Sequence, residues 1–315
     1  MKIIPQKVEL LKHDIHPYKF IEKVARTCYK SEDKITDDSA EKMVAGLCKS
    51  GHYAMLEHEY LYFNLSFSDR EWWNTHISYE DAKFLHIDST YISGSLRAFK
   101  ELFEKCESEY SPYADGKMLI YANRLCPLIF GASMIEYDVD ADGVLLWDDR
   151  ELFISEMAYY ADNKTIMKFI PHTLKFTTSR AIANELVRHR PASFAQESQR
   201  YVDYSKDKMD NQITVIEPLI HPTDILNYEN WHYAMVMAEC QYMNLRKGGM
   251  RPEIARGVLP NDCKTEIVVT ATEEEWQHII NLRYHGTTGT PHPQMRELMQ
   301  MAYPILQEES NGRIQ

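Results

Sequence analysis

Apolar residues recur along this chain at both helical and alternating spacing, which predicts a mixture of helices and strands. The first helix is predicted from four apolar residues on one helical face, Ile21, Val24, Ala25 and Cys28. A second helix is predicted to begin at Asp38, with Glu41 as its capping-box partner, and to end near Gly51. Residues 60–67 then alternate between polar and apolar, which predicts a half-buried strand.

The C-terminal half returns to clear patterns. A strand is predicted over 174–178, followed by a helix that Pro191 ends. Three polar residues of that helix share one face at spacings of three and four: Glu185, Arg188 and His189. A long helix is predicted over 230–245 and a strand over 265–271. Thr272 and Glu275 then form a capping box that opens a helix through Arg283.

The middle of the chain, residues 68–172, carries no chemical motif. It contains a predicted strand over 88–93, then a helix to about residue 106, and a later pair of strands around an acidic turn at 140–143. An alternative interpretation of this turn is a calcium-binding loop, because the spacing of its acidic residues and glycine matches such a loop: Asp138, Asp140, Asp142 and Gly143. Asp149 would then stand where that loop needs a glutamate, and no helices flank it, so an acidic hairpin tip is favoured.

Composition narrows the classes of function. The chain has 315 residues, of which 44% are hydrophobic and 26% charged, as in ordinary globular proteins, and its net charge is −12. That charge argues against a nucleic-acid partner, which needs an extended basic surface. Neither a signal peptide nor an apolar run of about 20 residues is visible, so we expect a cytoplasmic protein without a membrane partner.

The cysteines and histidines do not form a recognisable framework. Six scattered cysteines without a CxxC pair favour reduced, mostly buried thiols over disulfides or zinc, and we expect no metal site. They are Cys28, Cys48, Cys106, Cys126, Cys240 and Cys263.

Residues 188–201 form a basic segment, RHRPASFAQESQRY, in an otherwise acidic chain. Its arginines are permanent cations with planar donor groups suited to phosphate, and they repel one another unless an anion neutralises them. They are Arg188, Arg190 and Arg200. This pattern predicts a specific anion site, and the alternative is a solvated cationic surface.

Three further features accompany the basic segment, and each has a structural alternative. His52, Glu57 and His58 cluster in HYAMLEH, which is otherwise a loop with solvated side chains. Arg256 lies among apolar residues, where it could simply end a helix. Arg283 continues an apolar helical stripe and either reaches the surface or meets a buried anion.

Together these residues resemble the flavin-dependent thymidylate synthases. The family signature is R-H-R, seven residues, then S-x-R-Y, and it is matched without a gap by Arg188, His189, Arg190, Ser198, Arg200 and Tyr201. Supporting segments follow in family order: ARTCY at 25–29, the His52–His58 element, ARGVLPN at 255–261 and HIINLR at 278–283. The resemblance covers about 1–67 and 173–300.

The chain departs from the family pattern in three places. It inserts about a hundred residues, 68–172, where compact members have a short link. Ala195 stands where the family often has asparagine, which puts one contact to flavin or nucleotide in doubt. Cys28 stands in an element that often carries serine.

The resemblance implies a fold and a reaction. The fold is α+β, a sheet flanked by helices and not a Rossmann fold, in a single catalytic domain, 1–315, with the insertion at about 68–172. The reaction makes dTMP from dUMP, with a methylene from methylenetetrahydrofolate and hydride from FAD that NADPH reduces. No cysteine nucleophile is implied; the nearest to a Pro-Cys pair is Cys126-Pro127, in reverse order. Active sites are shared within a homotetramer.

The resemblance also assigns residues. FAD is held by Glu57, Arg188, His189, Arg190 and His278. The nucleotide dUMP is bound by Glu185, Arg188, Gln196, Ser198, Gln199, Arg200, Arg256 and Arg283. Arg283 and His52 are the catalytic candidates, and Arg283 would stabilise negative charge on the pyrimidine carbonyl. Ser198 is assigned to binding, because no general base adjoins it in sequence.

Other functions stay open at this point. A nucleotide-binding module without turnover would keep the same phosphate cradle, and only Ala195 and the insertion favour it. A related flavoenzyme that makes another C5-substituted deoxyuridylate would share the basic segment. An RNA-binding role is the weakest alternative, since the rest of the chain is acidic.

Overall fold

The computed structural model describes residues 1–13, 16–65, 85–88, 91–109, 122, 125–130, 144–146 and 150–315. The acidic turn at 140–143, the strand predicted before it and the alternative calcium loop lie outside these residues. Among the described helices, none combines the length and apolar composition that crossing a bilayer requires.

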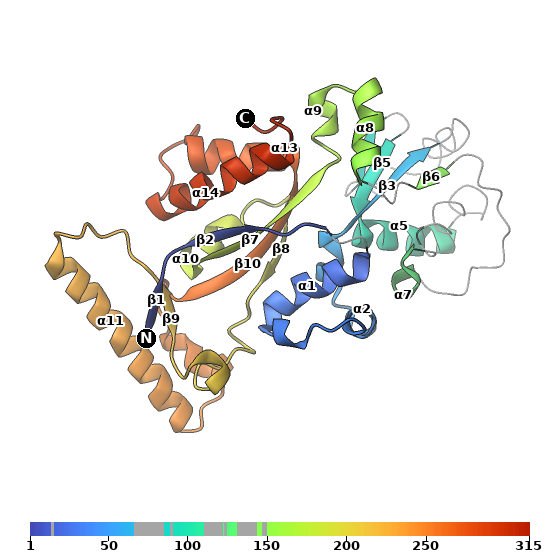
Figure 1. The fold of residues 1–315 in the computed structure, drawn as a ribbon. Coiled ribbons are helices and arrows are strands. Elements are labelled where there is room, and N and C mark those ends of the chain that lie inside the picture. The colour runs from blue at the N-terminus through green and yellow to red at the C-terminus, as the bar shows by residue number, and fades with distance from the viewer. Residues whose placement is uncertain are drawn as a thin grey trace.

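A four-stranded antiparallel sheet forms the centre of the molecule (Figure 1). Its order is β2 (Lys7–Leu10), β7 (Pro171–Ser179), β10 (Lys264–Thr272) and β8 (Ser193–Gln196). One face carries α10 (Arg180–Leu186), α13 (Glu273–Ile280) and α14 (Pro293–Glu309). The other face carries α1 (Pro17–Tyr29) and α2 (Ser39–Lys49). The predicted combination of a sheet with flanking helices is confirmed.

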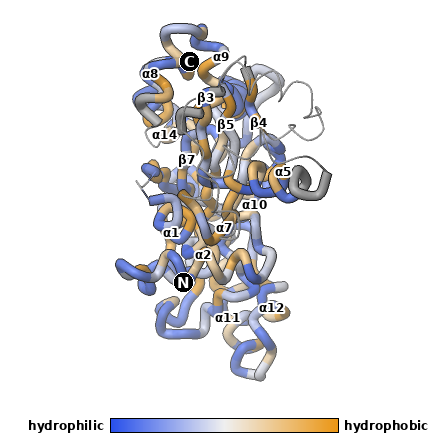
Figure 2. The backbone as a smooth tube through the Cα atoms, turned by 90° about the vertical axis from the view of Figure 1, so that its right-hand side faces the viewer, coloured by the Kyte–Doolittle hydropathy of each residue, from blue (hydrophilic) through white to orange (hydrophobic). Residues whose placement is uncertain are grey.

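Both faces of β10 are buried, and alternate residues enter different cores. Val268 packs with α1 and α2, whereas Ile267 and Val269 pack with α10, α13 and α14. Successive side chains of a strand point to opposite faces, so the sheet separates two hydrophobic clusters. Hydrophobic segments accordingly run along the middle of the molecule in Figure 2.

A second antiparallel sheet has the order β4 (Leu85–Asp88), β5 (Tyr91–Ser95), β3 (Tyr60–Leu65) and β6 (Val144–Leu146). The prediction that β3 is half-buried is wrong. Tyr62 packs on Phe153 of α8 (Arg150–Tyr160), with ring centroids 4.9 Å apart, and Phe63 packs on Phe99 of α5 (Leu96–Glu109), 5.1 Å apart. The tyrosines that looked polar in the alternation therefore face a second core. Two short helices, α7 (Pro127–Phe130) and α9 (Asn163–Ile166), complete this region.

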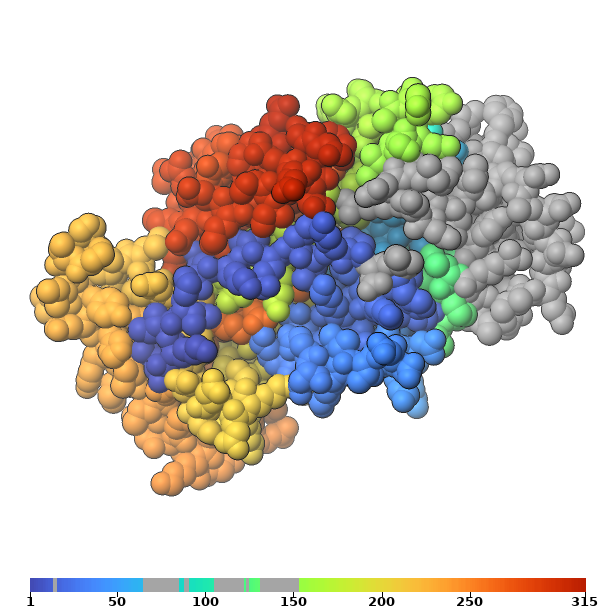
Figure 3. Space-filling model, in the orientation of Figure 1, coloured from blue at the N-terminus to red at the C-terminus, as the bar shows by residue number. Residues whose placement is uncertain are grey.

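The remaining elements form a lobe at one end of the molecule (Figure 3). It contains a parallel pair of strands, β1 (Lys2–Ile4) and β9 (Thr214–Ile216), with α11 (Ile225–Lys247) and α12 (Pro252–Ala255). The helix predicted over 230–245 is confirmed and begins earlier, where the Asp224 carboxylate accepts a hydrogen bond from the Asn227 amide.

Two predicted helix ends are wrong in detail. The second helix begins after Asp38, but ψ of Asp38 is 8°, so its side chain makes no capping hydrogen bond, and Glu41 is exposed. Helix α10 ends at Leu186 rather than at Pro191. The chain there tightens to i→i−3 hydrogen bonds, in which the His189 amide donates to Leu186 O at 3.1 Å.

Buried ion pairs join α1 to the central sheet. The Glu266 carboxylate on β10 contacts the ammonium groups of Lys30, Lys175 (2.6 Å) and Lys264 (2.8 Å). Burial alone would raise the pKa of Glu266, but these ammonium groups hold it well below its ordinary value. The charged form of Glu266 therefore stabilises the folded state.

We predict that Glu266→Gln lowers the free energy of unfolding by about 3 kcal/mol at pH 7, because it leaves buried ammonium groups unpaired. Since the folded-state pKa is depressed, this contribution is present above the carboxyl's ordinary pKa of 4.5 and fades as the pH falls below it. Urea unfolding from pH 7 to pH 2 checks this, with Glu41→Gln as an exposed control: the gap between parent and Glu266→Gln should be steady above pH 5 and shrink below pH 4.5. A constant gap between parent and Glu266→Gln across that range would contradict it.

Candidate functional site

The basic segment and the helix ending at Arg283 meet at one end of the sheet. Strand β8 runs antiparallel to β10, which brings the turn before β8 beside the start of α13. A cavity of about 350 Å³ opens there. It is lined by Arg188, His189, Arg190, Pro191, Glu275, His278, Leu282 and Arg283, and we call it the arginine pocket. A neighbouring cavity of about 670 Å³ shares Arg188 and Arg190 and adds Val187, Ala192 and Phe194.

Arg283 is held from two sides. Its Nη1 donates to Glu185 Oε2 at 3.1 Å, and its Nε donates to His189 Nε2 at 3.1 Å. Arg283 lies on a π-helical turn, Asn281–His285, which continues α13 and ends at Gly286 with φ of +71°. A Cβ at Gly286 would lie 3.0 Å from Gly289 O, so a larger residue would displace this turn. The predicted helix through Arg283 is confirmed, with this change of winding at its end.

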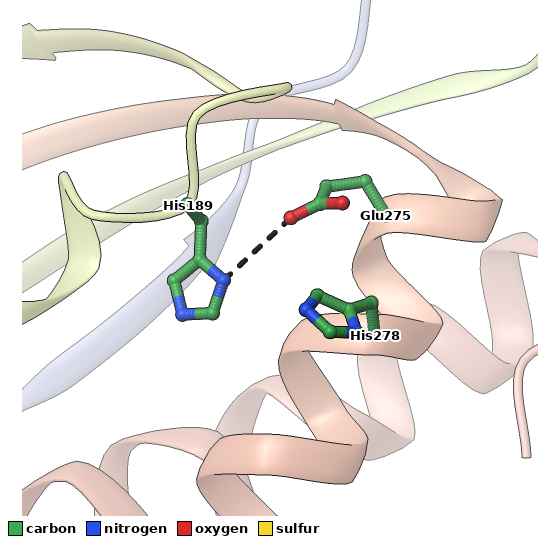
Figure 4. A group of neighbouring side chains, drawn as sticks. All are labelled: His189, Glu275 and His278. Atoms are coloured by element: carbon green, nitrogen blue, oxygen red, sulfur yellow. Dashed lines mark ion pairs between the residues drawn. The ribbon is translucent and has the colours of Figure 1, made fainter.

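The hydrogen bond from Arg283 defines the state of His189. A guanidinium can only donate, so His189 Nε2 must accept, and a neutral imidazole then carries its proton on Nδ1. His189 Nδ1 faces Glu275 Oε1 at 3.6 Å (Figure 4). A chain of polar contacts thus runs from Glu185 on α10 through Arg283 and His189 to Glu275 on α13.

His189, Glu275 and His278 are close enough to hold a metal ion, since their ligand atoms lie within 4.8 Å of one another. The surrounding charge opposes a cation: three guanidinium groups line the same pocket. Binding through Nδ1 would also move the His189 proton to Nε2, where it would face the Arg283 donor. The geometry favours anionic ligands, and the absence of a metal stays a prediction.

Arg188 and Arg190 are exposed, and no ion pair involves them among the residues that the structure describes. Both line the two adjoining cavities. Two unneutralised guanidinium groups at the shared wall are suited to a phosphate or diphosphate group.

The second half of the basic segment lies elsewhere. We call residues 197–201 the serine loop. The Ser198 amide donates to Cys28 O at the end of α1 (3.0 Å), and the Tyr201 ring packs on Tyr29, with centroids 5.6 Å apart. Tyr29 Oη lies 3.2 Å from His52 Nδ1. Arg200 is exposed and lies over the Tyr201 ring at 5.5 Å.

Two predicted nucleotide ligands in this region make contacts inside the protein. Gln196 Nε2 donates to Thr265 Oγ1 at 3.3 Å, and the Gln199 side chain, which is buried, lies 3.6 Å from Cys263 Sγ. Ala195 is also buried, in the core beneath α1. The exposed groups of the serine loop are therefore Arg200 and Tyr201, with Ser198 partly accessible.

Glu197 anchors the serine loop. Its carboxylate is buried and accepts from Lys264 Nζ at 2.8 Å and from the Glu266 amide at 3.2 Å. Arg180 Nη1 donates to Glu197 O at 3.3 Å. Lys264 also pairs with Glu266, so the loop is tied to the same buried charges that join α1 to the sheet.

The remaining candidates are dispersed. Glu57 pairs with Arg97 of α5 at 2.6 Å, on the same face of the sheet as α1. Arg256 is exposed beyond α12 and makes no ion pair among the described residues. His58 is fully buried, and desolvation lowers its pKa to about 3; its Nδ1 lies 2.7 Å from Thr270 Oγ1. His58 is a neutral core residue.

One chain does not bring all the predicted residues together. The arginine pocket lies beside α10 and α13, whereas the serine loop, His52 and Glu57 lie on the α1 face. Six residues lie between Arg190 and the loop, and the four of strand β8 alone span about 13 Å at 3.3 Å per residue. Arg180, at the start of α10, is close to the serine loop, and Glu185, near its end, contacts Arg283 of the arginine pocket.

Glu275 is a pocket residue that the sequence pattern assigned only to a capping box. One hydrogen bond of the capping box is present: the Glu275 amide donates to Thr272 Oγ1 at 3.5 Å. The Glu275 carboxylate points instead toward His189. The spacing of three between Glu275 and His278 was the signal that could have placed both on one face.

Comparison with known proteins identifies the class. Residues 119–310 match the family described as thymidylate synthase complementing protein. This match covers more than half of the chain, includes the basic segment and begins within the predicted insertion. The chain belongs to this family, and the family prediction made from the motif is confirmed.

Individual relatives agree over shorter stretches. The flavin-dependent thymidylate synthase of Pyrococcus abyssi is 34% identical over 105 residues, 33% of this chain and 42% of that protein. The enzyme of Pyrococcus horikoshii is 26% identical over 172 residues, 53% of this chain and 70% of that protein. The matched part of this chain thus spans less than half of the first of these relatives. A solved UMP/dUMP methylase, PolB from Streptomyces cacaoi, aligns over 100% of this chain and 99% of its own, with 14% identity and a TM-score of 0.42.

Proposed function

We propose that this protein is a flavin-dependent thymidylate synthase that converts dUMP to dTMP. Methylenetetrahydrofolate supplies the carbon, and FAD, reduced by NADPH, supplies the hydride. The observation that carries the proposal is the pair of unneutralised arginines of the family motif at the wall between two adjoining cavities. Family membership supports the same assignment.

The arginine pocket has the chemistry that FAD requires. Arg188 and Arg190 offer planar donors to its diphosphate, His278 offers a ring nitrogen beside them, and His189 lines the same pocket. Flavin supplies the redox chemistry when bound, and the protein supplies binding, orientation and electrostatics. In this proposal Glu57 completes the flavin site. Either its ion pair with Arg97 breaks, or the Glu57 that contacts the flavin belongs to another subunit.

The dUMP phosphate is assigned to the serine loop. Ser198, Arg200 and the backbone near Gln199 bind the phosphate, and Gln196 lies beside them. Arg283, which Glu185 and His189 hold in place, stabilises negative charge that develops on the pyrimidine carbonyl. Arg188 and Arg256 approach the nucleotide, and His52 lines the reacting side.

These assignments need more than one subunit. Since the arginine pocket and the serine loop lie on opposite faces of one sheet, we propose a homotetramer in which different subunits supply the two parts. The lobe around α11 offers apolar surface for association, because Ile225, Leu226 and Tyr233 are 64%, 70% and 67% exposed.

We also propose that residues 1–315 form one catalytic domain with an insertion at about 68–172. Strand β3 pairs with β5 and β6 from that segment, and α5 shares a hydrophobic core with α1. A cytoplasmic location stays a prediction from composition.

A product assay tests the reaction. Purified protein is incubated with dUMP, methylenetetrahydrofolate, NADPH and FAD, and the nucleotide is analysed by mass spectrometry. We expect dTMP in the complete mixture and none when the flavin is stripped and omitted. Folded, flavin-loaded protein that yields no dTMP would refute the proposal, and a new mass would indicate another C5 substituent.

Arg200→Ala tests the phosphate assignment. We predict that dUMP binds roughly ten- to a hundredfold more weakly, which corresponds to the loss of a hydrogen bond to a charged group worth about 1.5–3 kcal/mol, while FAD affinity changes little. Calorimetric titration with each ligand measures both. Arg251→Ala, which removes another exposed arginine, is the control. Equal dUMP affinity in Arg200→Ala and parent would overturn the assignment.

Cys126→Ala tests the absence of a thiolate nucleophile. Cys126 is fully buried, and burial raises the pKa of its thiol above the ordinary range, so the reactive thiolate is disfavoured. We predict that turnover stays within about twofold of the parent, as for Cys240→Ala at an exposed position. Loss of dTMP formation in folded Cys126→Ala would contradict the mechanism.

A further inference from the structure

Glu275 carries a buried oxygen that is not hydrogen-bonded. Its Oε1 is shielded from solvent, makes no hydrogen bond among the described residues and faces His189 Nδ1 at 3.6 Å (Figure 4). An unsatisfied buried carboxylate oxygen is costly, so its position calls for a physical reason.

The other two carboxylates in the first turn of α13 have different surroundings. Glu273 is buried and bonds Arg313 and His172, at 2.7 and 2.9 Å. Glu274 is exposed. Only Glu275 lines the arginine pocket, and the helix cap uses its backbone amide, which leaves its carboxylate available to His189.

We propose that Glu275 is a positioning residue: it favours the His189 tautomer with the proton on Nδ1, so that Nε2 stays an acceptor that orients Arg283. The inference rests on the proposed function for the role of Arg283, but the contact itself does not depend on any ligand. At 3.6 Å the Glu275 carboxylate acts through its charge, which favours a proton on the ring nitrogen that faces it; a carboxylate at hydrogen-bond distance orients the imidazole in the same way in catalytic triads.

The consequence of removing the carboxylate follows from donor and acceptor counting. Without Glu275, the proton of a neutral His189 is free to move to Nε2. Two N–H groups, from His189 and Arg283, would then face each other across 3.1 Å. Arg283 would keep only its contacts to Glu185 and would lose its orientation in the pocket.

Nitrogen-15 NMR of the flavin-free protein tests the contact directly. The His189 ring signals are identified by their loss in His189→Gln. We expect the Nδ1–H tautomer in the parent, a shift toward Nε2–H in Glu275→Ala, and retention of Nδ1–H in Glu275→Gln, whose amide oxygen still accepts. Glu274→Gln, the same charge change one residue earlier, should match the parent. An unchanged tautomer in Glu275→Ala, or Nε2–H in the parent, would overturn the proposal.

A flavin titration then separates this inference from the proposed function. We expect FAD to bind about tenfold more weakly to Glu275→Ala than to Glu274→Gln, a change of about 1.4 kcal/mol. If the parent binds no FAD while the tautomer responds as predicted, the function fails and the contact stands. Should Glu275→Ala not fold, Glu275→Met, which fills the space without an oxygen acceptor, carries both measurements: we expect the same shift toward Nε2–H, and an unchanged tautomer would overturn the proposal.

A zinc titration tests the alternative that His189, Glu275 and His278 form a metal site. Added Zn²⁺ should not bind the parent stoichiometrically, because His189 Nδ1 is protonated beside three guanidinium groups. Stoichiometric Zn²⁺ that is lost in both Glu275→Gln and His278→Ala would show a metal site instead and would overturn the positioning role.

Discussion

The central sheet is the constraint on which the site depends. Because β10 sends alternate side chains into two separate cores, the elements on its two faces cannot exchange partners without unfolding one of them. The turn before β8 is therefore fixed beside α13, and the residues after β8 are fixed beside α1. One basic segment of fourteen residues, 188–201, is divided between two faces, with Arg190 at one end of the strand and Arg200 beyond the other.

Charge holds each half in place. In the arginine pocket, Arg283 is fixed between Glu185 and His189, and Glu275 stands behind the imidazole. At the serine loop, Glu197 and Glu266 share Lys264. Burying the ion pairs at the serine loop costs desolvation, and removing one partner would leave a buried charge uncompensated. In the proposed function the ligands are phosphates, and the arginines assigned to them, Arg188, Arg190 and Arg200, make no ion pair among the described residues.

Much of this could be predicted from the sequence, and the exceptions have physical causes. The helices and strands with strong periodicity were located, and the R-H-R and S-x-R-Y motif identified the family. The burial of β3 was missed because its tyrosines count as polar in an alternation while their rings pack on Phe153. Glu275 was assigned to a cap because local spacing does not show where a side chain points. The separation of Arg283 from Arg200 depends on strand pairing between distant segments, which one sequence does not contain.

Subunit complementation is the most direct test of the proposal that each active site combines the arginine pocket of one subunit with the serine loop of another. Arg200→Ala and Arg283→Ala, each folded, are unfolded together in equal amounts, refolded and assayed for dTMP at a dUMP concentration at which neither variant alone is active. If each site takes Arg200 from one subunit and Arg283 from another, random mixing restores about a quarter of the parent's sites. Activity near that level supports the account. No recovery, in mixed assemblies shown to contain both variants, would contradict it.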